Sequence, residues 1–423
     1  MNKHIQQFLQ AVTNHIQSKE AKRFVSAELQ GHLAKSKDAW MKKGLSEEAA
    51  EERAVVEMGS PVSLGRSLNK LHRPKVDWML LSLLAIVLMM GFLPLLAVDA
   101  TEMAAMGSYL RNKAIFVLMG AILAVGIMYV DYRKLEKYGY FFYGIGVGIL
   151  MMLHVLPNQW VNGQPMMTIG PLTIHGFMVI PIFLLAWASF FNRKEFSLVR
   201  AGILFIISFL LLLVNLYSPV TLFVYTAMVA VLFCLSHFSK RKKAWLMTGS
   251  AVLLPVGGYF ALFNLEHYQL GRLYGFLSPE KYAESEGYLY LQLQQARSNA
   301  GWFGSGEPIY LPDSQTNLVL AGLIQQYGYV LGFILVAALS LIAVRIFIIA
   351  FGIKDRYGRL LVTGGLTIFT VQFLYHTGMT FGVLPFVSMP LPFMSYGLMP
   401  TLLGAFIMGL ALSVYRRKNL IVM

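Results

Sequence analysis

The sequence predicts an all-α, polytopic membrane protein of about ten transmembrane helices, preceded by a small cytoplasmic helical domain. Three observations support this fold class: 57% of the 423 residues are hydrophobic, only 13% are charged, and apolar runs of about 20 residues recur along most of the chain. Soluble domains carry roughly twice that charged fraction. A large soluble core, the alternative, would not need apolar runs of this length.

The net charge of +14 does not indicate a nucleic-acid-binding protein, because of where the basic residues lie. They concentrate in the N-terminal segment and in short connections between apolar runs, which is how a membrane protein fixes its orientation. The one cysteine, Cys234, lies in an apolar run, which argues against a disulfide framework or a thiolate metal site. Because the first 70 residues are polar, we expect no cleavable signal peptide.

Residues 1–75 predict a cytoplasmic domain of short helices, over roughly 4–17, 19–43, 47–58 and 63–72. Ser46 before two glutamates marks a helix start, and the stretch 59–61, Gly-Ser-Pro, marks a stop. An apolar stripe suits a small bundle: Phe8, Val12, Phe24, Val25, Leu29, Leu33 and Trp40. Since so small a bundle is marginally stable alone, we expect it to dock on the membrane domain or on a partner, in a regulatory role.

Residues 76–423 form the predicted transmembrane domain, whose spans are each long enough for a hydrocarbon core of about 30 Å. They cover roughly 77–97, 113–131, 138–156, 175–191, 199–217, 219–237, 244–263, 316–350, 360–376 and 396–415. The stretch 316–350 is too long for one upright span, so we expect it to begin outside the bilayer or to be broken.

Every second connection between spans is basic. With the N-terminus inside, all these clusters lie inside: 133–137, 193–200, 240–243, 354–359 and 416–418. We therefore expect a plasma-membrane protein with both termini cytoplasmic. Eight or twelve spans would keep this arrangement, whereas an odd number would not.

Two connections on the predicted outer side are unusual. The large loop 264–315 has its own polar pattern, and long ordered loops are more often functional than not. The connection 377–397 is hydrophobic yet contains Pro385, Pro390 and Pro392. Irregular backbone near membrane depth is tolerated only where it is buried in protein or lines a cavity. We expect a re-entrant, site-forming segment there; a rigid surface turn is the alternative.

The same connection reads GVLPFVSMPLPFMSYG at 382–397, and the large loop contains RLYGFLSP at 272–279 and GWFGSG at 301–306. These motifs, in order and spacing, resemble those of the SEDS family (shape, elongation, division and sporulation), the FtsW, RodA and SpoVE proteins, in which the first reads GLLPxTGxPLPFxSYG. The resemblance covers about residues 77–418. Residues 1–75 lie outside it and look similar to a prefix domain fused to some Firmicute membrane proteins.

The resemblance implies a bacterial plasma-membrane protein of cell-wall synthesis, in division, elongation or sporulation. It implies that the chain polymerises or handles lipid II, the undecaprenyl-pyrophosphate-linked disaccharide peptide. The implied partners are a class B penicillin-binding protein and membrane lipid, and no nucleic acid is expected to bind. No cofactor is evident. A divalent cation could accompany the pyrophosphate, but no residues identify a site for one, and the scattered His154, His175 and His376 predict no metal site.

The chain departs from the family pattern at its acids. The family's proposed catalytic Asp lies in LPEAHTDF, which here reads LPDSQTNL at 311–318, so Asn317 occupies that position. Neutral Val220, Gln325 and Gln326 likewise stand where the family has acids. The family's NGAxRWI…QPSE loop is represented by 162–176, without its Arg, Trp, Gln and Glu.

These departures matter because glycosyl transfer needs a base to deprotonate the acceptor 4-hydroxyl, and an amide cannot take up a proton at neutral pH. Positioned base catalysis contributes roughly 10²–10⁴-fold, so the exchange at Asn317 should cripple turnover. Asp313, four residues away, is the alternative catalytic residue. The other interpretation is that Asp313 caps a helix starting near Ser314.

The candidate substrate-binding residues lie in the two outer connections: Arg272, Glu286, Gln292, Arg297, Ser395 and Tyr396. The two arginines suit bidentate phosphate contacts, or anchor the loop at the membrane interface. Glu286 and Gln292 would position a sugar or fix the loop. The two hydroxyl residues would bind substrate or satisfy carbonyls freed by the prolines.

Three functions remain open from the sequence. The first is a peptidoglycan glycosyltransferase; the second is a catalytically silent homologue that binds a lipid-linked precursor or a partner and regulates wall synthesis. The third is a transporter of the lipid-linked precursor, against which stands the scarcity of ionisable residues within the predicted spans. The replaced acids favour the second function over the first, and the retained outer loop indicates that something binds there.

Overall fold

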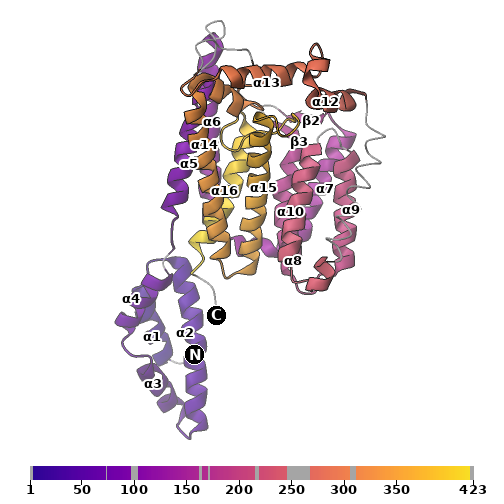
Figure 1. The fold of residues 1–423 in the computed structure, drawn as a ribbon. Coiled ribbons are helices and arrows are strands. Elements are labelled where there is room, and N and C mark those ends of the chain that lie inside the picture. Colours follow the sequence, from indigo (N-terminus) through magenta and orange to yellow (C-terminus); the bar gives the residue numbers. More distant parts are fainter. Residues whose placement is uncertain are drawn as a thin grey trace. The chain divides into compact units, whose positions relative to one another are not determined.

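The computed structural model describes residues 3–72, 74–96, 103–161, 164–169, 172–214, 219–244, 267–304 and 311–419. The chain divides into two compact units (Figure 1). The smaller unit comprises residues 1–77 and 414–423, and the larger unit comprises residues 78–413.

The smaller unit contains four helices, each within a few residues of its predicted position: α1 (Lys3–Asn14), α2 (Lys19–Lys42), α3 (Glu47–Glu57) and α4 (Pro61–His72). The hydroxyl of Ser46 accepts a hydrogen bond from the backbone of Ala49, which caps α3. Gly59, at φ 75°, follows the end of that helix. The core of the smaller unit is apolar and consists of Phe8, Leu9, Val12, Ile16, Ala21, Val25, Leu29, Leu33 and Ala54.

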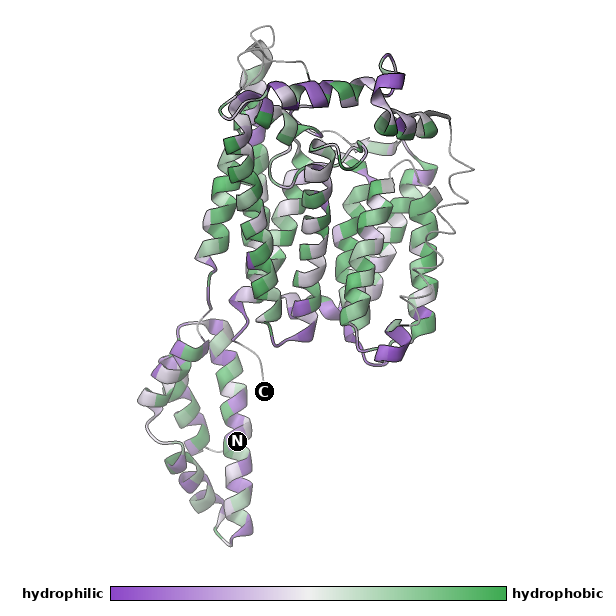
Figure 2. Cartoon of the chain, viewed as in Figure 1, coloured by the Kyte–Doolittle hydropathy of each residue, from purple (hydrophilic) through white to green (hydrophobic). Residues whose placement is uncertain are grey.

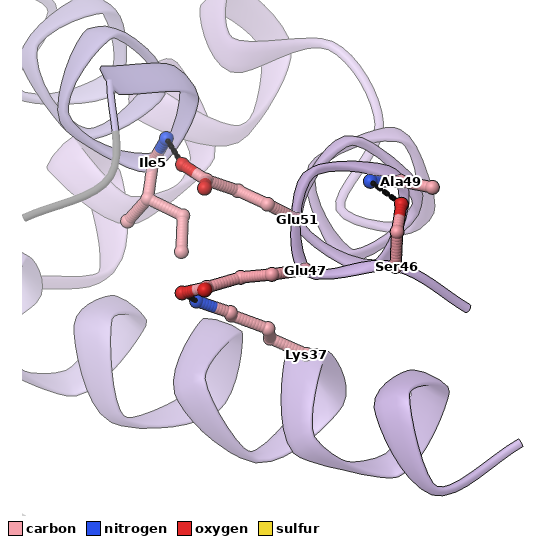
Figure 3. A network of polar contacts seen from close by, with 6 residues as sticks. All are labelled: Ile5, Lys37, Ser46, Glu47, Ala49 and Glu51. Atoms are coloured by element: carbon pink, nitrogen blue, oxygen red, sulfur yellow. Dashed lines mark hydrogen bonds and ion pairs between the residues drawn. The ribbon is translucent and has the colours of Figure 1, made fainter. Parts of the chain in front are cut away.

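Polar contacts join α3 to its neighbours in two different environments (Figure 3). The carboxylate of Glu51, only 4% exposed, accepts the backbone N–H of Ile5 at 3.0 Å, in the first turn of α1. The ion pair between Lys37 of α2 and Glu47, at 2.6 Å, is exposed on the Glu47 side. The C-terminal residues join this unit through Asn419, whose backbone oxygen lies 2.8 Å from Nδ1 of His72.

The larger unit is a bundle of apolar helices (Figure 2). They are α5 (Trp78–Met90) with η1 (Leu93–Leu95), α6 (Met103–Tyr129), α7 (Gly139–Val155) after η3 (Tyr132–Tyr138), α8 (Val179–Asn192), α9 (Leu198–Val214), α10 (Pro219–Leu235), α14 (Val319–Phe351), α15 (Arg356–Thr380) and α16 (Leu398–Arg416). Nine of the ten predicted spans therefore correspond to a helix, while the stretch 244–263 lies almost wholly outside the described residues. Six helical segments of the described chain are long and apolar enough to cross a membrane, and α8, α9 and α10 are apolar but shorter.

The long helix α14 is broken, which is one of the two arrangements that its length predicted. Gly328 interrupts it with φ 86° and ψ 173°. Beyond the break, the backbone N–H groups of Tyr329 and Val330 donate to the carbonyls of Gly301 and Trp302, at 3.1 Å each, so the loop supplies the acceptors that the helix lacks there. A side chain at position 328 would collide with the carbonyl of Trp302, which explains the glycine.

One end of the bundle carries the irregular elements. Helices α12 (His267–Leu277) and α13 (Tyr288–Asn299), joined through η5 (Pro279–Tyr282), lie across this end (Figure 1). A small antiparallel sheet of order β1-β2-β3 lies there too, formed by β1 (Gln159–Val161), β2 (Gln164–Ile169) and β3 (Leu172–His175), with Met166 opposite both Gln159 and His175. The hydrophilic α8–α9 and α14–α15 connections lie at the opposite end (Figure 2).

Between α15 and α16 runs the proline-rich segment, residues 381–397. It is irregular throughout, and much of it is buried, including Met389, Leu391, Phe393 and Met394. Although residues 381–383 and Ser388 are exposed, the segment as a whole is not a surface turn, so that alternative is wrong. The tyrosine hydroxyl of Tyr375 donates to the carbonyl of Pro385 at 3.2 Å, which ties the segment back to α15.

Candidate functional site

A cavity of about 380 Å³ lies within the larger unit, between the proline-rich segment and the surrounding helices. Apolar residues of α6, α8, α10 and α16 form most of its wall, among them Leu123, Ile182, Val220, Leu403 and Phe406. The polar side chains that line it are His175, Thr221, Thr316, Asn317, Ser388, Ser395 and Tyr396. Within the described parts of the chain, no Asp, Glu, Lys or Arg lines this cavity.

Asn317 lies in the cavity wall with both ends of its amide hydrogen-bonded. Its Nδ2 donates to the Asp313 carboxylate at 3.0 Å, and its Oδ1 accepts from the Ser388 hydroxyl at 3.1 Å. The partners on either side thus fix the orientation of the amide. The sequence spacing of four residues does bring Asp313 and Asn317 together, but through a turn and not through a helix.

The expectation that Asp313 caps a helix starting near Ser314 is wrong. Residues 312–318 form turns, and α14 begins only at Val319, with no side-chain cap from the preceding Leu318. The backbone oxygen of Asp313 closes this 311–318 turn by accepting the N–H groups of Thr316 (2.9 Å) and Leu318 (3.0 Å). Pro312 and the φ of 56° at Asp313 explain why no helix forms here. The Asp313 side chain is exposed and is not part of the cavity wall.

Ser395 and Tyr396 join the proline-rich segment to the 311–318 turn. The Ser395 hydroxyl donates to the carbonyl of Thr316 at 2.6 Å and accepts the N–H of Leu391 at 2.8 Å. The backbone N–H of Tyr396 donates to the carbonyl of Gln315 at 2.8 Å. Within the protein, therefore, the serine hydroxyl is occupied by backbone groups, while both side chains border the cavity.

The other four sequence-predicted site residues lie outside the cavity lining, on α12, on α13 and between them. Arg297 donates from Nη1 to the carbonyl of Thr380, the last residue of α15, at 2.7 Å, and desolvation lowers the pKa of its guanidinium. Gln292 donates to the hydroxyl of Tyr288 at 2.6 Å, one turn away on the same helix. The positive charge of Arg272 opposes the desolvation that raises the pKa of Tyr290.

Glu286 packs closely against α12. A Cβ atom at Gly271 would come within 2.7 Å of a Glu286 carboxylate oxygen, and one at Gly275 would meet the Glu286 backbone at 2.6 Å. The loop is fixed in turn to the proline-rich segment, because the hydroxyl of Tyr290 accepts the N–H of Phe386 at 3.0 Å. This end of the bundle is thus one connected structure from α12 to the cavity wall.

Sequence reasoning missed two residues near the cavity. Lys113 is fully buried within α6 and donates to three carbonyls of the proline-rich segment. From the apolar run we predicted a span that starts at Lys113. Helix α6 instead begins at Met103, so Lys113 lies inside the helix. His175, counted among scattered histidines, lines the cavity, and desolvation lowers its pKa. Of the replaced acids, Val220 lines the cavity and Gln325 is buried.

The family of FtsW, RodA and SpoVE, described as cell cycle proteins, matches residues 75–420. The probable peptidoglycan glycosyltransferase FtsW of Trichlorobacter lovleyi is 23% identical over 321 residues, covering 72% of this chain and 83% of the relative. Stage V sporulation protein E of Bacillus subtilis is 28% identical over 170 residues, covering 39% of this chain and 46% of the relative.

Two solved structures share the fold of the larger unit. A chain from a study of polymerization and crosslinking by a peptidoglycan synthase complex superposes with a TM-score of 0.67 at 23% identity, covering 81% of this chain and 98% of the neighbour. The crystal structure of the rod shape determining protein RodA of Thermus thermophilus gives a TM-score of 0.57 at 19% identity, covering 81% and 97%.

Proposed function

Because the chain belongs to the FtsW, RodA and SpoVE family of membrane proteins of cell-wall synthesis, we propose that its cavity binds lipid II but does not polymerise it efficiently. The observation that carries this proposal is the amide of Asn317. It occupies the family's position for the catalytic Asp, borders the cavity, and has Asp313 and Ser388 as its hydrogen-bond partners.

Polymerisation requires a group that removes a proton from the acceptor hydroxyl. A neutral carboxamide cannot take up that proton at physiological pH, and the described lining of the cavity contains no carboxylate. The Asp313 carboxylate already accepts from Asn317 and lies outside the lining. Since a positioned base is worth roughly 10²–10⁴-fold, turnover through this site should be slow at best.

Binding is supported by the size and polarity of the cavity. Its volume of about 380 Å³ falls in the range of small-molecule pockets. The apolar wall suits part of a polyprenyl chain, and the hydroxyl and amide groups at the proline-rich segment suit a sugar or a phosphate. Such a site can hold a lipid-linked precursor, present it to a partner, or withhold it.

For the partner we propose a class B penicillin-binding protein. The fold similarity to a chain of a peptidoglycan synthase complex supports this choice. For orientation we propose that both termini are cytoplasmic and that α12, α13 and the proline-rich segment face outward. Basic side chains at the opposite end support this, since Arg133, Lys134, Lys137 and Arg193 gather around one shallow depression there.

The test uses the full-length protein in lipid nanodiscs with fluorescent lipid II, alone and with a class B penicillin-binding protein. We expect saturable binding and little or no glycan strand growth. Val220→Phe should weaken binding, because the larger side chain in the cavity wall would occupy space that the ligand needs. Val199→Phe, at a position 71% exposed on α9, should leave binding unchanged. Rapid strand growth that is lost in Asp313→Ala would overturn the silent function, and absence of binding would overturn the assignment of the ligand.

A further inference from the structure

Lys113 carries a positive charge in the interior of the larger unit. Its side chain is fully buried, and its ammonium donates to the carbonyls of Phe393 (3.4 Å), Met394 (3.0 Å) and Ser395 (3.0 Å). An ammonium has three donors, and these three carbonyls account for all of them. Burying a charge is costly unless it is compensated, so a lysine at this place on a predicted span indicates a function.

The segment needs such a partner because its backbone cannot satisfy itself. Pro390 and Pro392 lack an N–H group, and Phe393 adopts a positive φ of 67°, which is unfavourable for a residue with a side chain. Three successive carbonyls then converge on one point, where Lys113 meets them. The backbone just after α5 also packs tightly against these carbonyls, since a Cβ atom at Gly91 would lie 3.0 Å from the carbonyl oxygen of Phe393.

The residue that follows these carbonyls is Tyr396, which lines the cavity. Two rings of α6 pack against the Tyr396 ring: Tyr109 edge-on, at 5.3 Å between centroids, and Phe116 at a tilt, at 5.7 Å. Asn112, beside Lys113, reaches the Tyr396 hydroxyl oxygen with Nδ2 at 3.4 Å, a long contact in which the oxygen is the acceptor. The hydroxyl hydrogen is therefore available to donate elsewhere.

We propose that Lys113 is a positioning residue, which fixes the backbone of residues 393–395 so that the Tyr396 hydroxyl donates a hydrogen bond to the polar part of a ligand in the cavity. This inference rests on the proposed function, in which that ligand is a lipid-linked precursor. The contacts of Lys113 also bear on Asn317, because Tyr396 and Ser395 hold the 311–318 turn through the carbonyls of Gln315 and Thr316.

The first measurement needs no ligand. Hydrogen exchange of the full-length protein in nanodiscs should show faster exchange at residues 388–398 in Lys113→Met, which removes all three donors. Lys113→Gln keeps an amide donor and should restore part of the protection. Ser208→Ala is the matched control, since it breaks a buried hydrogen bond to Tyr225 elsewhere in the bundle and should leave this segment unchanged.

The second measurement is the affinity for fluorescent lipid II. We expect Lys113→Met and Tyr396→Phe each to weaken binding by about tenfold. If the lysine acts through the tyrosine, the double variant should bind no more weakly than the single ones, because the two changes remove the same contact. Lys113→Gln should recover part of the affinity, and Ser208→Ala should keep it.

Two results would overturn the positioning role: unchanged exchange at 388–398 in Lys113→Met, or fully additive losses in the double variant. If the wild-type protein does not bind lipid II, the ligand contact of Tyr396 fails together with the proposed function. Hydrogen exchange then still decides whether Lys113 holds the segment, so the two failures are distinguishable.

Discussion

The side-chain amide of Asn317 donates a hydrogen bond to the carboxylate of Asp313 over 3.0 Å. A carboxylate placed at position 317 would therefore lie beside another carboxylate. Two such groups cannot both ionise freely, so they share a proton and titrate as a pair. Restoring the family's acid at this position is for that reason not a simple change, and the structure indicates how to design it.

We predict that Asn317→Asp combined with Asp313→Asn will polymerise lipid II faster than the wild type. The exchange keeps one carboxylate and one amide, with the carboxylate now bordering the cavity, and Ser388 can still donate to it. Up to about 10²–10⁴-fold is expected from a positioned base. Asp313→Asn alone should stay at the wild-type level, and Asn317→Asp alone should gain less than the double variant.

The measurement is glycan strand length with time, on gels, at equal lipid II occupancy. A double variant that folds and binds lipid II but polymerises no faster than the wild type would show that the missing base is not what limits this chain.

Lipid II binding should strengthen as the pH falls. Desolvation lowers the pKa of His175, so its imidazole is neutral in the empty cavity at pH 7. Tyr396 is the other titratable side chain in the described lining. A bound diphosphate would raise the pKa of His175, so binding takes up a proton, and affinity should rise as the pH falls below neutral.

Calorimetry in two buffers of different ionisation enthalpy would measure this proton uptake directly. His175→Gln, which keeps a polar group of similar size, should abolish it. The same uptake in the variant would assign the proton to another group and contradict the prediction.

Local sequence patterns explain what could be predicted of this fold. Apolar runs mark the spans, and caps such as Ser46 and Gly59 mark the ends of the N-terminal helices within a few residues. The buried position of Lys113 could not be predicted from the sequence, for two reasons. Helix α6 begins ten residues before the apolar run, and the carbonyl partners of Lys113 lie about 280 residues further along the chain. The strands β1 and β3, of three and four residues, are too short to show an alternating pattern.

In the candidate site, too, local motifs could be recognised from the sequence, whereas contacts between distant residues could not. Motif resemblance singled out Asn317, Ser395 and Tyr396 one by one, and the structure places all three in the lining of one cavity. It gave no means of seeing that the Arg297 side chain reaches a carbonyl at the end of α15, because that contact joins residues 83 positions apart.

Arg297→Gln should therefore reduce stability more than it reduces ligand affinity. It leaves the carbonyl of Thr380, a fully buried residue, without the Nη1 donor, a loss of about 1–3 kcal/mol. The midpoint of thermal unfolding in nanodiscs should fall, while the dissociation constant for lipid II stays close to that of the wild type. An unchanged midpoint with sharply weaker binding would instead make Arg297 a ligand contact.

Gly328→Ala should destabilise the larger unit. Alanine is strained at φ 86°, and its Cβ would collide with the carbonyl of Trp302, which accepts from Val330. We expect a cost of about 1–3 kcal/mol. Gly148→Ala is the control, because nothing lies within 4 Å of its added carbon in α7, and the change should be neutral or stabilising by about 0.5–1 kcal/mol. Equal unfolding midpoints for the two variants would show that the break in α14 is not constrained by the loop.

Glu51 should matter more than Glu47 for the smaller unit, although both are acids of the same helix. Glu51→Ala leaves the N–H of Ile5 unpaired in the first turn of α1, where the helix itself supplies no acceptor, so we expect a loss of about 1–3 kcal/mol. Glu47→Ala removes an ion pair that is exposed on the glutamate side, which is worth less than about 1 kcal/mol. Limited proteolysis of the full-length protein should cut Glu51→Ala faster within residues 1–77 and leave Glu47→Ala near the wild-type rate. The reverse order of cleavage would mean that the exposed ion pair, and not the buried carboxylate, holds α3 in place.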